Sequence, residues 1–385
     1  MTTTTKVLIA NPSADVYGSD LQMLQSVAAF RSAGHHVVVA LPADGPLVPM
    51  LEAAGAEILS VDFPVLRRAN ASPGPFLSML LDAARAVPRL RRTIRRVAPD
   101  VVYVNTVTLP WWLVAARAAR RPVVCHVHEA ETEDRRLVRL ALTSPLLLAD
   151  ATLVISRSTM RAMCEVVPRL ERRARLVYNG VPEPDETPTL PVAAGDTPDA
   201  ASPWRVVVVA RLSPRKAPHL ALEAVADLRR EGRDVRLELC GTAFEGYESY
   251  VAELRARSEQ PDLRGAVTFS GYTSPVWPAL ARSHMMLAPS LREPFGNAVV
   301  EAQLALRPVV ATAALGHLES IKDGETGLLV KVGDADAMAL ATARLMDDKE
   351  LANRLAVQAR RSALDRFTTD RYARKVNELV EELSR

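Results

Sequence analysis

The sequence predicts an α/β protein built from two doubly wound domains, and three observations support this. Short runs rich in Val and Ile recur in both halves of the chain, helix-like segments lie between them, and one stretch without periodicity separates the halves. The runs are continuous rather than alternating, which is typical of parallel strands covered by helices on both faces. At 385 residues the chain is also too long for one ordinary core.

The first half predicts a Rossmann-like domain over residues 1–181. A helix-like segment, SDLQMLQSVAAFRSAG, follows its first apolar run. The expected strands are KVLIA (6–10), HVVVA (36–40), AEILSV (56–61), DVVYVN (100–105), PVVCHV (122–127) and ATLVIS (151–156).

A linker and a second Rossmann-like domain follow. Residues 182–203 are rich in Pro, Asp, Thr and Ala and have no periodicity, which indicates a linker. Residues 204–365 predict the second domain, in which a ligand would bind beyond the carboxyl ends of the strands, so we expect the two domains to face each other across a cleft. Its expected strands are RVVVVA (205–210), VRLELC (235–240), AVTFSG (266–271), HMMLAPS (284–290) and PVVATA (308–313).

The composition gives no sign of a nucleic-acid partner. The 48 Lys and Arg residues against 45 Asp and Glu leave a net charge of only +3. Three widely spaced cysteines are expected to be reduced thiols of a cytoplasmic protein. The first residues lack a signal-peptide core, and the most apolar stretch, residues 137–156, is broken by Arg139, Pro145 and Asp150, so no spanning helix is expected.

Two glutamates stand in the segment REPFGNAVVEA, residues 292–302. Glu293 falls in the loop that leaves the strand HMMLAPS, and Gly296 and Asn297 fall at the start of the next helix, where free N–H groups favour an anion or a hydroxyl-rich ligand. Glu301 lies on a helix that is apolar in nearly every direction, and a buried carboxylate needs a partner. The alternative is that Asn297 is only the helix N-cap and Glu301 a solvated surface residue.

Two cations follow a strand in a similar way in the segment RVVVVARLSPRKAPHLALEAV. Arg211 stands at the end of the strand and Lys216 in the loop before the next helix, which is where a phosphate would bind in a doubly wound domain. The alternative is ordinary solvated charge on a loop.

Taken together, these motifs resemble a known family. ARLSPRKAPHL, LAPSLREPFGNAVVEA and DGETGLLV are similar, in order and spacing, to the nucleotide-sugar site of the GT4-type retaining glycosyltransferases, whose two-domain architecture is called GT-B. The resemblance extends to PDVVYVNT, PVVCHVHE, LVYNGV and the final segment, about residues 366–385, which looks like the family's helix that returns to the first domain.

The resemblance implies roles for the residues that match. In the second domain, the roles are donor diphosphate binding by Arg211 and Lys216, ribose binding by Glu301, a catalytic role at the donor sugar for Glu293, and main-chain contacts to sugar and phosphate from Phe295, Gly296 and Asn297. The first domain would bind the acceptor, with Gly18 and Ser19 as a loop near acceptor and phosphates, although the family usually has two glycines there.

A histidine at the end of the fifth strand is also implied to be catalytic. The family has a functional histidine near the sugar, and it aligns with His128, which precedes Glu129, better than with His126. A metal site of Cys125 with both histidines is disfavoured, because strand alternation places the cysteine on the opposite face and structural zinc takes four ligands.

The chain also departs from the family at some positions. Gly316 and His317 stand where the family commonly has two glycines, so His317 is either close to the donor sugar or a tolerated surface change. Asp334 and Asp336 look like an acidic metal pair, but a helix N-cap is the favoured interpretation of Asp334.

The implied reaction moves a sugar from a nucleoside diphosphate to a hydroxyl of a glycan, a lipid-linked molecule or a small molecule, with retention of configuration and with no cofactor or metal. Two alternatives are a sugar-nucleotide epimerase of the same architecture and a glycoside hydrolase that uses Glu293 and Glu301. A third observation is the arginine-rich helix around Arg89–Arg96, which is either a solvated face or a contact with nucleic acid or with the inner face of the membrane.

Overall fold

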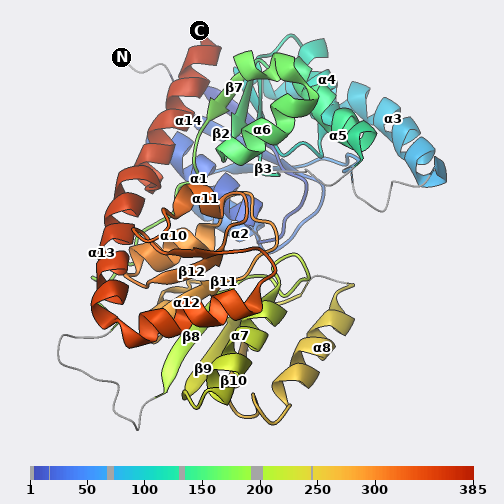
Figure 1. The fold of residues 1–385 in the computed structure, drawn as a ribbon. Coiled ribbons are helices and arrows are strands. Elements are labelled where there is room, and N and C mark those ends of the chain that lie inside the picture. Colours follow the sequence, from blue (N-terminus) through green and yellow to red (C-terminus); the bar gives the residue numbers. More distant parts are fainter. Residues whose placement is uncertain (1–3, 17, 67–72, 130–134, 192–202, 244–245) are drawn as a thin grey trace. The chain divides into compact units, whose positions relative to one another are not determined.

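The computed structural model describes residues 4–16, 18–66, 73–129, 135–191, 203–243 and 246–385 (Figure 1). The chain divides into two compact units, of which the first holds Met1–Gly180 with Thr369–Arg385 and the second holds Val181–Thr368. Residues 192–202, which make up half of the predicted linker, lie outside the described residues.

The first unit contains a sheet of seven parallel strands in the order β3-β2-β1-β4-β5-β6-β7. All six predicted strands are confirmed, with small differences at their ends, whereas the last strand of the sheet was not predicted. The strands are β1 (Lys6–Ala10), β2 (His36–Leu41), β3 (Glu57–Ser60), β4 (Val101–Asn105), β5 (Val123–Val127), β6 (Ala151–Val154) and β7 (Ala174–Leu176).

Helices cover both faces of this sheet, as continuous apolar strands require (Figure 1). On β5, Cys125 joins the apolar cluster on one face and Val124 the cluster on the other face. The helices of the unit are α1 (Gly18–Ser32), α2 (Val48–Ala53), α3 (Pro73–Val97), α4 (Pro110–Ala118), α5 (Arg136–Thr143), α6 (Arg157–Val166) and α14 (Thr369–Ser384), with 3-10 turns at Ser144–Leu148 and Pro168–Arg172.

The C-terminal helix α14 belongs to the first unit and lies against α1 (Figure 1). The Tyr372 hydroxyl lies 2.5 Å from Ser26 Oγ, and Asn377 Nδ2 donates to the Ala29 carbonyl at 3.1 Å. A Cβ at Gly180 would lie 2.8 Å from Tyr372 Cβ, so only glycine lets the end of the first segment pass this close to the helix.

The second unit contains six parallel strands in the order β10-β9-β8-β11-β12-β13. All five predicted strands are confirmed, and only the last strand was not predicted. They are β8 (Trp204–Val209), β9 (Val235–Cys240), β10 (Val267–Gly271), β11 (Met285–Ala288), β12 (Val309–Thr312) and β13 (Leu328–Val330). The helices are α7 (Pro218–Arg230), α8 (Glu248–Ser258), α9 (Trp277–Ala281), α10 (Asn297–Leu304), α11 (His317–Ser320), α12 (Ala335–Asp347) and α13 (Lys349–Arg366).

The side chain of Asp334 accepts a hydrogen bond from the Ala337 N–H at 2.9 Å and caps α12. The predicted N-cap is therefore confirmed.

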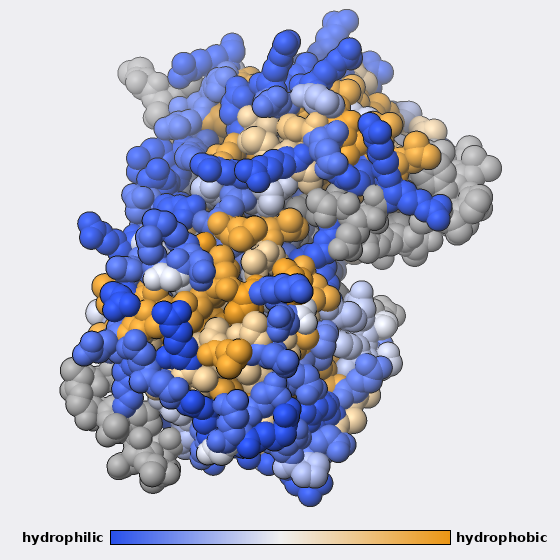
Figure 2. All heavy atoms as spheres, in the orientation of Figure 1, coloured by the Kyte–Doolittle hydropathy of each residue, from blue (hydrophilic) through white to orange (hydrophobic). Residues whose placement is uncertain are grey.

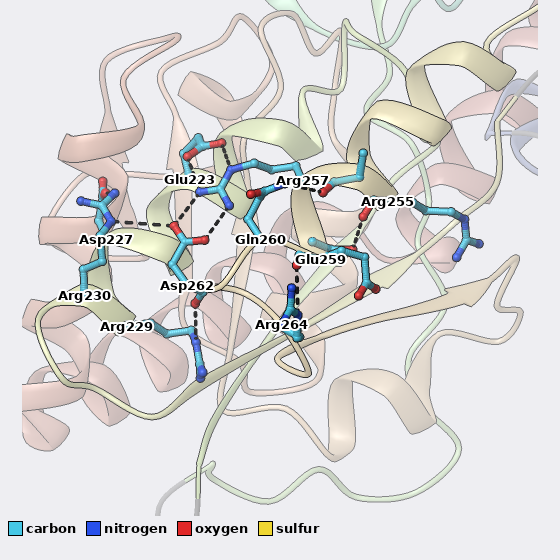
Figure 3. Close-up of polar contacts among 12 residues, drawn as sticks. Glu223, Asp227, Arg229, Arg230, Arg255, Arg257, Glu259, Gln260, Asp262 and Arg264 are labelled. Atoms are coloured by element: carbon cyan, nitrogen blue, oxygen red, sulfur yellow. Dashed lines mark hydrogen bonds and ion pairs between the residues drawn. The ribbon is translucent and has the colours of Figure 1, made fainter.

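A network of charged side chains joins α7 to α8 and to the turn that follows α8 (Figure 3). The Arg257 guanidinium donates to Glu223 on α7 at 2.7 and 2.9 Å and to Asp262 in the turn at 2.8 and 2.9 Å. Paired donors of a planar guanidinium fix direction as well as distance, so this residue holds α8 in register on α7.

No helix in the described part of the chain is both long enough and apolar enough to cross a membrane.

Candidate functional site

The centre of the second sheet is the point where its strand order reverses, between β8 and β11. Loops that leave two such strands diverge and create a crevice at the carboxyl edge of a parallel sheet. The loop after β8 carries Arg211, which is half-buried, and Lys216, and the loop after β11 carries Glu293. The Leu291 N–H donates to the Arg215 carbonyl at 2.9 Å and ties the two loops together.

Lys216 and Glu293 form a direct ion pair, in which the ammonium donates to Glu293 Oε2. Ser290 Oγ donates to the same oxygen at 3.2 Å. Burial alone would raise the pKa of Glu293, but the positive charges of Lys216 and Arg215 and the hydrogen bond from Lys216 oppose it, and the pKa is lowered. The Glu293 carboxylate is therefore ionised, and a residue predicted to bind diphosphate stands beside a residue predicted to bind sugar.

Two glycines shape the backbone around this pair. Gly296 has φ +94°, in the left-handed region that favours glycine, and it occupies the N-cap position of α10. A Cβ at Gly316 would lie 2.5 Å from Phe295 Cα, and the Gly316 N–H donates to the Glu293 carbonyl at 2.7 Å. The loop after β12 therefore lies directly on the loop after β11.

His317 lies in the same place, with its ring buried. Its Nδ1 donates to the Thr312 carbonyl at 2.9 Å, and its Nε2 lies 3.4 Å from where a Cβ of Gly296 would be. Burial lowers the pKa of His317, against the opposing charge of Glu293, so the ring is neutral and its Nε2 is a hydrogen-bond acceptor. The interpretation of His317 as a tolerated surface change is wrong, because packing against the two loops buries the ring.

Phe295 can offer only its main-chain groups to a ligand, because its side chain is buried. The Phe295 side chain is buried edge-to-face on Phe367, with ring centroids 5.4 Å apart. Gly296, not Asn297, is the N-cap, so the alternative that Asn297 is merely the cap is wrong. Asn297 is the first residue of the helix and is half-buried.

Glu301 lies in the second turn of α10 and is half-buried. Among the described residues, no side chain or main-chain group donates a hydrogen bond to its carboxylate or pairs with it. Burial raises the pKa of Glu301 to about 7. The described part of the chain thus supplies no partner for this carboxylate, which is available to a ligand that brings its own donors.

In the first unit the strand order reverses between β1 and β4, and polar side chains gather at the carboxyl edge there. His128, after β5, places Nε2 2.8 Å from Asn105 Oδ1, and Asn105 Nδ2 donates to Asn11 Oδ1 at 2.7 Å. Helix α1 starts at Gly18, where a Cβ would meet no atom within 4 Å, and the Ser19 carbonyl accepts from Asn105 Nδ2 at 3.3 Å. The predicted residues of this edge are therefore neighbours.

The two histidines of β5 differ in their access. His126 is fully buried, and its Nδ1 lies 2.7 Å from the Tyr103 hydroxyl. His128 lies beyond the end of the strand, with its ring centroid 4.0 Å from that of His126. Cys125 joins the cluster on the other face of the sheet. Across the described residues, no three His, Cys, Asp or Glu side chains gather closely enough to hold a metal ion.

Two family models match this chain. The model described as Glycosyltransferase Family 4 matches residues 18–183, and the model described as Glycosyl transferases group 1 matches residues 196–362. The chain belongs to the GT4-type glycosyltransferases.

Relatives and solved structures agree with this assignment. The putative glycosyltransferase EpsD of Bacillus subtilis (strain 168) is 32% identical over 176 residues, 46% of this chain and 44% of EpsD. The lipopolysaccharide core biosynthesis glycosyltransferase LpsE of Rhizobium meliloti (strain 1021) is 33% identical over 165 residues, 43% of this chain and 46% of LpsE. The chain thus spans less than half the length of these curated relatives.

The fold is the GT-B fold. The structure of Alr3699/HepE from Anabaena in complex with UDP-glucose superimposes on this chain with a TM-score of 0.82, at 24% identity, and the match covers 98% of this chain and 100% of HepE. The complex of HepE with UDP and glucose superimposes with a TM-score of 0.81.

Sequence reasoning on this GT4-type chain missed Asn11, Asp20 and Asn105. Asn11 and Asn105 stand at the carboxyl ends of buried apolar strands, and this position was the available signal. No sequence pattern marked Asp20, because its contact with Asn11 forms only when the first turn of α1 packs against the end of β1.

The raised pKa of Glu301 predicts a pH-dependent stability. An ordinary Glu has a pKa of 4.5 and Glu301 about 7, so between these values the folded protein binds a proton that the unfolded chain releases. The free energy of unfolding therefore falls as pH rises through this window, because ionisation is unfavourable only in the folded state. Relative to wild type, Glu301→Gln should gain about 2 kcal/mol between about pH 5 and about pH 8. Urea unfolding at both pH values measures this, and a pH-independent difference would contradict it.

Proposed function

We propose that this protein transfers a sugar from a nucleoside-diphosphate sugar to a hydroxyl of an acceptor, with retention of the anomeric configuration. One structural observation supports this proposal independently of the family match. At the β8/β11 edge a half-buried carboxylate without a protein partner, Glu301, lies on the helix that starts beside the Lys216–Glu293 ion pair. Ribose hydroxyls would supply the donors that Glu301 lacks.

The second unit offers matching groups for the charged part of such a donor. The leaving group is a diphosphate, whose developing charge would be stabilised by Arg211, Lys216 and the N–H groups at the start of α10. The N-cap of α10 is a glycine and brings no side chain of its own to the start of the helix. Glu293 would accept from hydroxyls of the donor sugar, and His128 would contact a substrate hydroxyl.

The transfer step needs neither a protein nucleophile nor a redox partner, because every bond that breaks is matched by one that forms. The bond from the anomeric carbon to the β-phosphate oxygen breaks, and the acceptor oxygen bonds to the same carbon. The acceptor hydroxyl proton passes to the departing diphosphate. Because cationic side chains and a helix start meet the charge, we propose that no metal is required.

A uridine diphosphate sugar is the first donor to test, because HepE, which shares the fold, was solved with UDP-glucose. The acceptor is a glycan, a lipid-linked molecule or a small molecule. One relative is named for lipopolysaccharide core biosynthesis and another is named alpha-D-kanosaminyltransferase, and these names indicate no common acceptor.

The opposite pKa shifts of Glu293 and Glu301 are also those of an acid and nucleophile pair in a glycoside hydrolase. The family match favours transfer, and a hydrolase needs no diphosphate site. Release of sugar from an aryl glycoside without nucleotide would support hydrolysis, and appearance of an epimeric donor without acceptor would support epimerisation. The anomeric configuration of a transfer product, read by NMR, tests retention.

The donor site is tested by nucleotide affinity. Glu301→Ala should raise the Kd for UDP about tenfold or more at about pH 8, because a carboxylate that accepts from ribose hydroxyls contributes about 1.5–3 kcal/mol. The exposed Glu350 of the same unit gives the matched control, Glu350→Ala, which should bind UDP as wild type does. Calorimetry measures both affinities, and an unchanged Kd in Glu301→Ala with an unchanged melting temperature would count against the proposal.

The metal-independent mechanism is tested by chelation. Turnover of UDP-glucose should persist in excess EDTA at a rate close to that of the untreated enzyme. Complete loss of turnover that divalent metal restores would overturn this part of the proposal.

Contact with an anionic membrane is the second proposal, and the first unit supports it with two exposed surfaces. On α3, Leu90 and Ile94 are buried whereas Arg89, Arg92, Arg95 and Arg96 are exposed, so the arginines form one outward face. Apolar and hydrophilic side chains lie together over α5 in Figure 2, where Leu137 is 79% exposed. Exposed cations and exposed apolar side chains on the same unit suit an anionic lipid surface.

Vesicle sedimentation tests this contact. Replacing Arg89, Arg92 and Arg96 with Gln should weaken binding to phosphatidylserine-containing vesicles on the order of a hundredfold, at about 1 kcal/mol per cation. The control replaces three exposed arginines of the second unit, Arg264, Arg354 and Arg361, with Gln and should bind as wild type. Equal sedimentation of all three proteins would leave the α3 arginines as a solvated face.

A further inference from the structure

Four polar side chains form a continuous hydrogen-bonded chain at the carboxyl edge of the first sheet. His128 Nε2 lies 2.8 Å from Asn105 Oδ1, Asn105 Nδ2 donates to Asn11 Oδ1 at 2.7 Å, and Asn11 Nδ2 donates to Asp20 Oδ1 at 2.8 Å. Asn11, Asn105 and Asp20 are buried, and His128 is nearly so. They come from the ends of β1, β4 and β5 and from the first turn of α1.

Main-chain carbonyls determine which atom donates in each hydrogen bond that joins these four side chains. Asn11 Nδ2 also donates to the Ser13 carbonyl at 2.7 Å, and Asn105 Nδ2 to the Ser19 carbonyl at 3.3 Å. A carbonyl oxygen can only accept a hydrogen bond, so the side-chain atom of each asparagine that faces a carbonyl must be Nδ2. The Asn105 oxygen is then the atom that faces His128, and an oxygen of an amide can only accept as well. His128 Nε2 must therefore carry the hydrogen.

The second ring nitrogen of His128 is left for a ligand. Burial lowers the pKa of His128 to about 3, so the ring is neutral and holds one hydrogen. With that hydrogen on Nε2, Nδ1 has a free lone pair, and no described residue bonds it. His126 differs, because its Nδ1 meets the Tyr103 hydroxyl and its whole side chain is buried.

We propose that Asn105, supported by Asn11 and Asp20, is a positioning residue that locks His128 in the Nε2–H tautomer, so that Nδ1 accepts a hydrogen bond from a substrate hydroxyl. This inference rests on the proposed glycosyl transfer. It assigns the partner of His128 a chemical class, since a nitrogen that only accepts selects a hydroxyl and rejects a phosphate oxygen. Asn105 itself does not touch substrate.

The tautomer is measured directly by ¹⁵N NMR of the histidine side chains in the full-length protein. The chain has 7 histidines, and the signals of His128 are assigned by their loss in His128→Gln. We expect wild type to show Nε2 protonated. Asn105→Leu, which keeps the size and removes the acceptor, should lose this fixed tautomer, whereas Asn105→Asp keeps an acceptor and should retain it. A wild-type His128 protonated on Nδ1 would overturn the inference.

Turnover of UDP-glucose supplies the second readout. Asn105→Leu should lower kcat on the order of tenfold or more with the Kd for UDP unchanged, and Asn105→Asp should recover part of that loss. Tyr103→Phe, at a buried position of the same strand, is the control that should lower stability without lowering kcat. Equal kcat in Asn105→Leu and wild type would also overturn the inference. If wild type does not turn over any donor, the proposed function fails, and the NMR result still decides the tautomer.

Discussion

The parallel strand order is the constraint on which the rest of the structure depends. It brings all strand carboxyl ends of a unit to one edge, and the strand order reverses between β1 and β4 and between β8 and β11. Residues far apart in sequence therefore meet there. Lys216 reaches Glu293 across 77 positions, and Asn105 reaches Asn11 across 94. No local segment of the chain contains either pair.

The edge of the second unit shows how the surroundings, and not the residue type, decide what a carboxylate can do. Glu293 and Glu301 belong to one short segment, yet the pKa of Glu293 is lowered and that of Glu301 is raised. Both are buried enough to favour the neutral form, but only Glu293 has a cation beside it. Glu293 consequently has hydrogen-bond and ion-pair partners within the protein, whereas Glu301 has none among the described residues.

The edge of the first unit has a different chemistry. Its central groups are two amides and neutral imidazoles, and the Asn11 amide donates to Asp20. Glu129 lies next to them and accepts from the Thr106 hydroxyl and from the main-chain N–H of His128. Such groups suit hydroxyls rather than phosphates, because the surrounding carboxylates repel an anion. The two units thus differ in charge, because the edge of the second unit carries cations, which suit an anion, and the edge of the first unit carries uncharged groups, which suit hydroxyls.

The sequence by itself determined eleven strand positions and the loops that hold Arg211, Lys216, Glu293 and His128, because buried parallel strands are continuous apolar runs and polar residues follow them directly. It missed β7 and β13, whose three residues each are too few to form such a run. Only the tertiary structure decided that His317 is buried, that Lys216 pairs with Glu293 and that Asn105 orients His128. These contacts depend on which strand ends are neighbours and on which atom of a side chain faces its partner, and strand order and packing set both.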